Sequence, residues 1–183
     1  MDTIGYIQAH CGTSGMEKDF IKAFRKVFAG PPYFERRASS YVREHVWTPH
    51  LERGLIVLAY GGSHVAGFGC AIPLLDLLAE EIYEFLQAHG FEADPQLTWY
   101  MSELGVLDAY RGRGIGARLV LNRLLRIRAS GGSHYCLITQ SEGSNSEHLY
   151  RKIGAVEVDV DEETESRYFA GSCEEAISRL KAT

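Results

Sequence analysis

Residues 103–117 read E-L-G-V-L-D-A-Y-R-G-R-G-I-G-A, and every other element is interpreted relative to this stretch. The apolar run Leu104–Leu107 predicts a strand, which Asp108 ends. From Ala117 to Arg128 the apolar residues recur at helical spacing. The stretch therefore predicts a strand, a glycine-rich loop and a helix in direct succession.

The loop carries three glycines, Gly112, Gly114 and Gly116. A helix start leaves unpaired backbone N–H groups and carries the positive end of the helix dipole. Because glycine has no Cβ, an anion can approach this backbone closely. The arrangement predicts a site for a phosphate or a pyrophosphate.

Two common phosphate-binding loops do not match this spacing. The glycines form G-x-G-x-G rather than the G-x-G-x-x-G of dinucleotide sites, and no acidic residue stands between Asp108 and Glu142 to hold a ribose. A P-loop requires G-K-[ST], which is absent. Neither a dinucleotide site nor a P-loop is therefore expected.

A third pattern does match, R-x-x-G-x-G over Arg111–Gly116. It resembles the acyl-CoA loop of the GNAT superfamily of N-acetyltransferases. A second motif of that superfamily, L-Y-x-x-x-G, is similar to Leu149, Tyr150 and Gly154 in this chain. The resemblance covers the order of elements along most of the chain, and these two motifs carry it.

Two positions depart from the second motif. The chain has Gly154-Ala155 where the family pattern usually ends in Gly-Phe. Gly143 stands where the family usually has an asparagine that contacts pantetheine. Asn145 and Ser144 are the nearest replacements, and Asn145 is taken as a candidate for that contact.

The resemblance implies an α/β (α+β) fold with a mixed, mostly antiparallel central sheet of about seven strands flanked by helices. It also implies a splayed cleft between the fourth and fifth strands, where the acyl-CoA arm enters. We expect one acetyltransferase domain over residues 1–183, with a helical insertion at about 73–97 between strands 3 and 4. This insertion could shape the acceptor site, form a homodimer contact or be a packed surface decoration.

Periodicity and turn residues predict the individual elements. The expected strands are 3–9, 55–60, 64–72, 97–107, 134–139, 156–160 and 167–170. The expected helices are 16–29, 40–45, 74–89, 117–128, 145–153 and 174–181, with Pro49 closing the second of these.

The resemblance also implies which residues contact acetyl-CoA. The strand before the loop would lie beside the pantetheine and the thioester carbonyl, and the loop would hold the pyrophosphate. The expected cofactor-binding residues are Leu104, Gly105, Val106, Arg111, Gly112, Arg113, Gly114, Ile115, Gly116, Ala117 and Asn145. Six arginines fall between residues 111 and 128, and most are expected on a solvated face.

Two residues are candidates for catalysis. Glu103 is the nearest base to take a proton from the amine, directly or through a water. The alternative is a solvent-facing residue at a strand start, with waters alone removing the proton. By the family match, Tyr150 would protonate the leaving thiolate, and the alternative is a tyrosine that only packs and hydrogen-bonds beside the sulfur.

The aromatic pair Tyr33-Phe34 and Glu35 follow directly after the first helix. One interpretation is that the rings cap the core. The other rests on the resemblance, because in that family the segment between the first two helices lies over the acceptor pocket.

Composition limits the function classes. The 183 residues suit one domain, and 45% hydrophobic content is enough for a core. The net charge of −5 argues against nonspecific nucleic-acid binding. The spacing of the four cysteines and seven histidines suits neither a metal site nor a disulfide framework. With no signal-peptide pattern and no long apolar run, a cytoplasmic protein without a membrane partner is expected.

The first functional hypothesis is an enzyme that moves an acetyl group from acetyl-CoA to a primary amine of a small molecule, by direct transfer in a ternary complex. A protein N-terminal or lysine acetyltransferase is a variant of it. A non-catalytic acyl-CoA-binding regulatory module is the alternative of another class. Glu103 and Tyr150 favour the enzyme, because a binder needs only the loop.

Overall fold

The computed structural model describes residues 3–10, 14–31, 33–139 and 145–182. Contacts within the chain divide it into two units, which are described separately. Unit 1 comprises residues 1–71 and 103–123, and unit 2 comprises residues 72–102 and 124–183.

Unit 1 is built on antiparallel strands. They are β1 (Ile4–Gln8), β2 (Leu55–Gly61), β3 (His64–Pro73, which continues into unit 2) and β5 (Leu104–Val106). The strand β2 pairs with β1 and β3, and β5 pairs with β3 through Gly67–Gly69. The helices of this unit are α1 (Ser14–Phe28), α2 (Ser39–Val42), α3 (Thr48–Arg53) and the first part of α5 (Ile115–Ala129).

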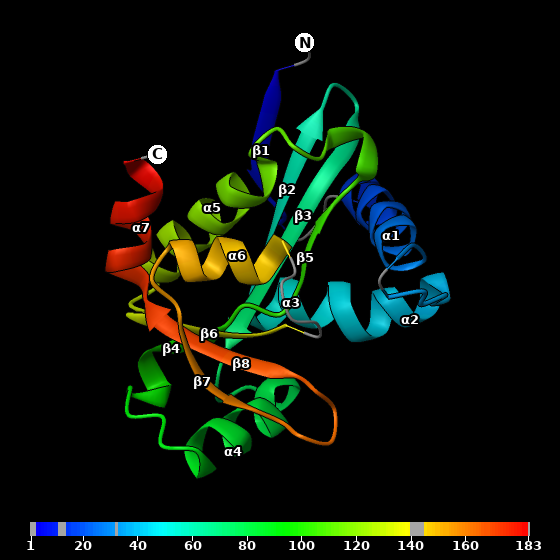
Figure 1. The fold of residues 1–183 in the computed structure, drawn as a ribbon. Helices are drawn as coiled ribbons and strands as arrows, with labels where there is room; N and C mark the ends of the chain where they lie inside the picture. Colours follow the sequence, from blue (N-terminus) through cyan, green and yellow to red (C-terminus); the bar gives the residue numbers. More distant parts are fainter. Residues whose placement is uncertain (1–2, 11–13, 32, 140–144, 183) are drawn as a thin grey trace. The chain divides into compact units, whose positions relative to one another are not determined.

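Helices α1 and α5 lie on opposite faces of β3 (Figure 1). Phe20 and Phe24, four residues apart on α1, both place their rings against Phe68 on β3, at 5.2 and 5.6 Å between centroids. Gly67, which precedes Phe68 and therefore faces the other way, lies under Leu119 of α5. The alternation along β3 thus explains why one strand supports two helices.

Unit 2 contains the mixed part of the sheet. The end of β3 pairs antiparallel with β4 (Thr98–Tyr100), which pairs in parallel with β6 (His134–Thr139). The strand β8 (Arg167–Ser172) pairs antiparallel with β6 and with β7 (Val156–Val160). Helices α4 (Glu80–Ala88), α6 (Asn145–Lys152) and α7 (Cys173–Lys181) complete the unit.

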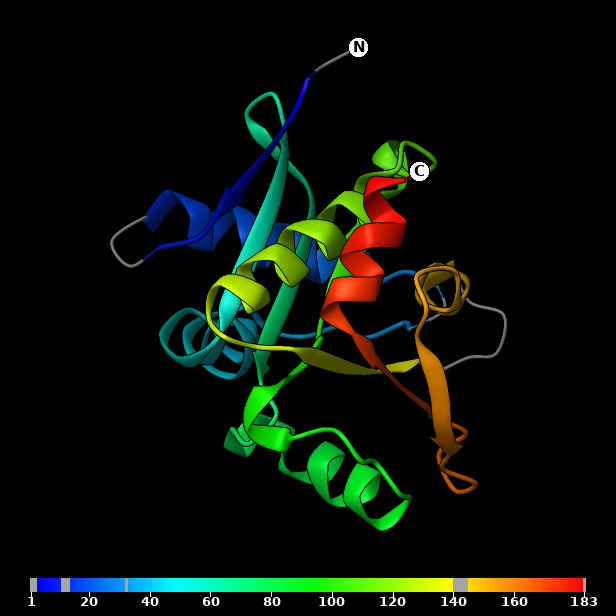
Figure 2. The ribbon, with the colours of Figure 1, turned by 90° about the vertical axis from the view of Figure 1, so that its left-hand side faces the viewer.

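Helices α4 and α6 cover opposite faces of β6 and β8 (Figure 2). Phe85 of α4 stacks on Tyr168 of β8 with 3.8 Å between ring centroids. On the other face, Tyr150 of α6 lies 6.2 Å from the ring of Tyr135 on β6. The hydrogen-bonded strand order β1-β2-β3-β4-β6-β8-β7, with β5 paired to β3, confirms the expected mixed and mostly antiparallel sheet with flanking helices.

Two helices differ from expectation. Pro49 does not close the second helix, because a π-helical turn over Arg43–Trp47 carries the helical backbone into α3, where Pro49 occupies the first turn. The Thr48 N–H donates to the carbonyl of Arg43 in the π-helical turn, and Pro49, which has no N–H, follows where the hydrogen-bond pattern changes from π to α. In the insertion, 3₁₀ turns at Leu77–Ala79 and Pro95–Leu97 flank α4, which is shorter than the expected helix.

The expected strand 97–107 is interrupted. β4 and β5 are separate, and residues 101–103 lie between them. Gly69 of β3 pairs with Leu104, and Ile72 of β3 pairs with Tyr100. Between these two pairs, residues 70–71 of β3 lie opposite residues 101–103. One extra residue is the signature of a β-bulge, which redirects the side chains beside it. Glu103 is one of the three residues of this bulge.

Candidate active site

The glycine loop of unit 1 has the backbone conformation that its glycines allow. A 3₁₀ turn at Asp108–Tyr110 precedes it and α5 starts directly after it, at Ile115. Gly112 and Gly114 have φ angles of 74° and 72°, a region that L side chains rarely adopt. A Cβ at either position would meet no atom within 4 Å. The backbone conformation, rather than crowding by protein atoms, therefore requires glycine at both positions.

Helix α5 begins with N–H groups that can bind an anion. The N–H of Arg118 donates to the carbonyl of Gly114 at 3.1 Å, as the first closed turn of the helix. The N–H groups before it belong to a first turn, which lacks intrahelical acceptors. With 15 residues, α5 has a full dipole at this end. Ile115, Gly116 and Ala117 thus carry the N–H groups of this first turn.

Arg111 and Arg113 remain at the loop and contact it. Arg111 donates from Nε to the carbonyl of Val106 at 3.2 Å and lies 3.0 Å from Asp108. Arg113 donates to the carbonyl of Ala109 at 3.2 Å, and its guanidinium lies over the Tyr110 ring. Both side chains are exposed, so each keeps donors directed to solvent at the loop.

The strand before the loop is shaped by an aromatic ring. A Cβ on Gly105 would lie 2.4 Å from Cζ of Phe68, so a larger residue cannot stand there without moving the core. Gly105 is buried, whereas Leu104 and Val106 keep partial exposure. Packing against Phe68 thus explains why a glycine stands between Leu104 and Val106. The sequence alone gave no reason for this glycine.

Glu103 lies at the bulge, where its backbone is held firmly. Its carbonyl accepts the N–H of Cys70 at 2.9 Å and Nη1 of Arg123 at 3.0 Å. The residue keeps partial exposure, but the protein around its carboxyl removes water from it. This desolvation, with a smaller contribution from Glu35, raises the pKa of Glu103 to about 8, while Arg123 opposes the rise. Carboxyls with such pKa values concentrate at catalytic sites.

The segment after α1 lies in the same electrostatic neighbourhood. Burial, Glu103 and Glu35 raise the pKa of the Tyr33 hydroxyl, and Arg111 lowers it. The Tyr33 ring also packs on Phe28 of α1, at 4.8 Å. The charges of Glu103 and Glu35 thus both act on the Tyr33 hydroxyl within unit 1.

Phe34 differs from its neighbour. It has a φ of 52° and leaves 71% of its surface exposed. Two backbone hydrogen bonds close the turn around it, from Phe34 N to Gly30 O at 3.0 Å and from Glu35 N to Phe28 O at 2.7 Å. A bulky residue with positive φ is strained, and such strain is concentrated at functional sites. Tyr33 packs against the core, whereas Phe34 does not.

Tyr150 belongs to unit 2 and is 2% exposed. Its carbonyl accepts the N–H of Ala155 at 3.0 Å, and the N–H of Gly154 donates to the carbonyl of Arg151 at 3.1 Å. Gly154 has a φ of 96°. These features form a Schellman motif, the glycine-dependent end of a helix. The glycine of the L-Y-x-x-x-G motif therefore ends the helix that carries the tyrosine.

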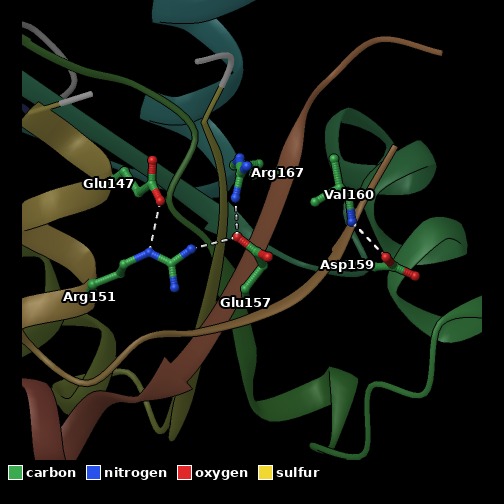
Figure 3. A network of polar contacts seen from close by, with 6 residues as sticks. All are labelled: Glu147, Arg151, Glu157, Asp159, Val160 and Arg167. Carbon is green, nitrogen blue, oxygen red and sulfur yellow. Dashed lines mark hydrogen bonds and ion pairs between the residues drawn. The ribbon is translucent and has the colours of Figure 1, made fainter. Parts of the chain in front are cut away.

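A chain of alternating charges holds α6 to the hairpin of β7 and β8 (Figure 3). The Nε of Arg151 donates to the buried carboxylate of Glu147 at 2.8 Å, and its Nη2 donates to Glu157 at 2.6 Å. Glu157 also accepts Nη1 of Arg167 at 2.8 Å. The Arg151 guanidinium lies 4.8 Å from the ring centre of Phe169. The residue that follows Tyr150 thus fixes α6 on the strands below it.

The remaining candidate, Asn145, is the exposed first residue of α6. Gly143 and Ser144 lie outside the described residues. Across the described residues, no group of three or more His, Cys, Asp or Glu side chains is placed to hold a metal ion. Within those same ranges, every helix is too short or too polar to span a bilayer.

The sequence model of the Acetyltransferase (GNAT) family matches residues 18–155, which is most of the chain. The chain belongs to the GNAT family. The family match spans the glycine loop, Glu103 and the L-Y-x-x-x-G motif. No curated protein sequence matches the chain.

Solved structures share the GNAT fold at low sequence identity. An acetyltransferase of the GNAT family from Staphylococcus aureus Mu50 has a TM-score of 0.70 and 13% identity, covering 93% of this chain and 99% of its own. The PaiA N-acetyltransferase from Thermoplasma acidophilum, in complex with coenzyme A, has a TM-score of 0.66, 16% identity and coverages of 93% and 99%. A GNAT acetyltransferase from Brucella melitensis, in complex with acetyl-CoA, has a TM-score of 0.63, 16% identity and coverages of 94% and 89%.

One residue that contacts Glu103, the candidate base, was not predicted from the sequence to lie there. Arg123 was counted among the arginines of a solvated face, but it is fully buried and bonds to the backbone of Glu103. A signal was present in β3, where Gly67 and Gly69 leave room on the face that supports α5. Those glycines do not reveal which residue of the helix uses the space.

Proposed function

We propose that this GNAT protein transfers the acetyl group of acetyl-CoA to a primary amine of a small molecule, directly and within a ternary complex. The observation that carries the proposal is Glu103 itself, whose backbone is anchored to Cys70 and Arg123 directly before β5 and the glycine loop, and whose carboxyl has a pKa raised to about 8 by burial. An ammonium must lose a proton before it can attack a carbonyl carbon. A base with a pKa near the working pH is suited to that step.

Acetyl-CoA supplies an activated thioester when it is bound. We assign its pyrophosphate to the backbone of residues 112–117 and its pantetheine to the edge of β5 and to Asn145. The positive φ angles at Gly112 and Gly114 and the first turn of α5 support this assignment. Arg111 and Arg113 would add charge at the same anion.

The transfer forms one bond and breaks another. The amine nitrogen bonds to the acetyl carbon, the C–S bond breaks, and the electron pair of that bond goes to sulfur. Glu103 accepts the proton of the amine, directly or through a water, and Tyr150 donates a proton to the thiolate. The amide and free coenzyme A are the products.

A cationic acceptor is favoured by the charges of unit 1. The charge of Glu35 contributes to the raised pKa of Glu103, and Phe34, next to Glu35 in the chain, exposes an apolar surface. The net charge of −5 adds a weaker long-range attraction for a cation. Protein N-termini and lysine side chains share this chemistry, so a protein acetyltransferase is the closest alternative.

Release of free thiol from acetyl-CoA, measured with a panel of small amines and peptides, tests the proposal. Turnover with small amines and none with peptides is the expected result. Turnover with peptides alone would indicate the protein acetyltransferase. Tight coenzyme A binding with no thiol release for any acceptor would indicate a regulatory binding module instead.

We also propose a cytoplasmic setting and a single functional domain, with the insertion at 73–97 as a homodimer contact. Cys70, Cys136 and Cys173 are free and buried, as in a reducing compartment. The insertion exposes Leu75 and Leu77, at 51% and 81%, which is the kind of surface that a subunit contact covers.

A further inference from the structure

Arg123 of α5 is a fully buried arginine within unit 1. Its Nη1 donates to the carbonyl of Cys70 at 2.8 Å and to the carbonyl of Glu103 at 3.0 Å. The Cys70 N–H donates to the same Glu103 carbonyl. One guanidinium therefore joins α5 to β3 and to the bulge that carries the proposed base.

The strand below is built to receive this side chain. A Cβ on Gly69 would lie 2.8 Å from Nε, 3.0 Å from Cδ and 3.1 Å from Cζ of Arg123. Only glycine leaves that volume empty. Two residues earlier on the same face, Gly67 lies under Leu119, one helical turn before Arg123. Arg123 thus faces β3 over a glycine, as the apolar Leu119 does one helical turn earlier.

A buried guanidinium needs a reason, because removing a charge from water is unfavourable unless partners compensate for it. The two carbonyls provide hydrogen bonds but no negative charge. Among the described residues, the titratable groups with a resolved electrostatic interaction with Glu103 are Glu35 and Tyr33 after α1, Cys70 on β3 and Arg123 on α5. Among these groups, Arg123 is the one that stabilises the ionised carboxylate.

We propose that Arg123, seated over Gly69, is a positioning residue for acetyl transfer that fixes the backbone at Glu103 and supplies the positive charge beside its carboxyl. The inference rests on the proposed role of Glu103 as the base. Burial and Glu35 raise the pKa of Glu103, and Arg123 opposes the rise.

The test compares Arg123→Met, which removes the charge at similar length, with Arg123→Lys, which retains it. Two readouts are used: the pH profile of kcat/KM for the amine, and the titration of the Glu103 carboxyl carbon by NMR. Arg123→Met should move both midpoints to higher pH by more than about half a unit, which lowers kcat/KM at pH 7 about threefold or more. Arg128→Met, on the exposed end of the same helix, should leave both midpoints in place.

A folded Arg123→Met protein whose midpoints coincide with those of the unaltered protein would overturn the proposal. If Arg123→Met does not fold, Arg123→Lys decides. Arg123→Lys should keep the midpoint of the pH profile but lower kcat without raising the KM for acetyl-CoA, since an ammonium cannot reproduce the guanidinium geometry. An unchanged kcat would overturn the proposal. If the unaltered protein shows no turnover, the proposed function fails, and the NMR titration still decides whether Arg123 controls the Glu103 proton.

Discussion

Arg151 joins helix α6 to strand β7 through the 2.6 Å contact between its Nη2 and Oε2 of Glu157. The same guanidinium bonds to Glu147, whose side chain is 7% exposed, and Tyr150 is its neighbour in the chain. Helix α6 has only eight residues, a length at which a helix in isolation is unstable. Contacts with the strands must therefore hold it, and with it Tyr150.

Replacing Arg151 with methionine should loosen α6. Glu147 loses this ion pair and α6 loses its link to Glu157, so we expect a lower Tm and faster hydrogen exchange of the α6 amides. The control is Arg43→Met, which removes the exposed ion pair with Glu17 and should change the Tm little. Equal effects of the two substitutions would show that the Arg151 bridge does not hold the helix.

Tyr150→Phe should lower kcat by about 100-fold, because a positioned general acid typically contributes 10²- to 10⁴-fold. The KM for acetyl-CoA should change little, since the ring and its packing on Tyr135 are retained. Steady-state kinetics with acetyl-CoA and the best amine provide the measurement. An unchanged kcat would remove Tyr150 from the chemistry.

The pH dependence of activity should show one group that must be deprotonated. With the pKa of Glu103 raised to about 8, the carboxyl is mostly protonated at pH 7 and accepts no proton. The kcat/KM for the amine should rise with pH and level off above about pH 8. Glu103→Gln should abolish this ascending limb. A limb that persists in the variant would assign it to another group.

The same carboxyl affects stability with a definite sign. Its pKa is raised from 4.5 to about 8 on folding, so the folded state favours the protonated form. The resulting stabilisation is fully present below pH 4.5 and is lost as the pH rises through 8. The free energy of unfolding, measured with denaturant at pH 5, 7 and 9, should therefore decrease less with rising pH in Glu103→Gln than in the unaltered protein. Parallel pH curves would contradict a raised pKa.

Gly114→Val should abolish coenzyme A binding measured by calorimetry. Valine at a φ of 72° is strained, and its side chain would occupy the space expected for phosphate oxygens. Gly90→Val is the matched control, since Gly90 has a φ of 78° and also no atom near an added Cβ. Both variants should lose similar stability, and normal coenzyme A affinity in Gly114→Val would exclude the loop as the phosphate site.

Local patterns predicted the elements of the fold because each depends on residues close in sequence. The spacing of Phe20 and Phe24 was enough for α1, and the apolar run before the glycine loop was enough for β5. The bulge at residues 101–103 could not be predicted, because it arises from the pairing of one segment with β3 at both ends. The helical run through Pro49 depends on a π-helical turn that has no reliable sequence signal.

The candidate site divides in the same way. The glycines of the loop and Tyr150 were found because the GNAT family has motifs at fixed spacing. Arg123 was not found, since its burial depends on Gly69, which is 54 positions earlier in the chain. The partner of Arg151 was also not found, because Glu157 meets it only when β7 folds back beside α6.

The central claim is that backbone N–H groups between residues 112 and 117 bind the diphosphate of coenzyme A. Amide NMR of the unaltered protein, titrated separately with coenzyme A and with pantetheine, tests it most directly. Large shifts of the Gly112, Gly114 and Gly116 amides with coenzyme A, and little change with pantetheine, which lacks the diphosphate, are the expected result. Saturation with coenzyme A that leaves these three amides unshifted would contradict the account.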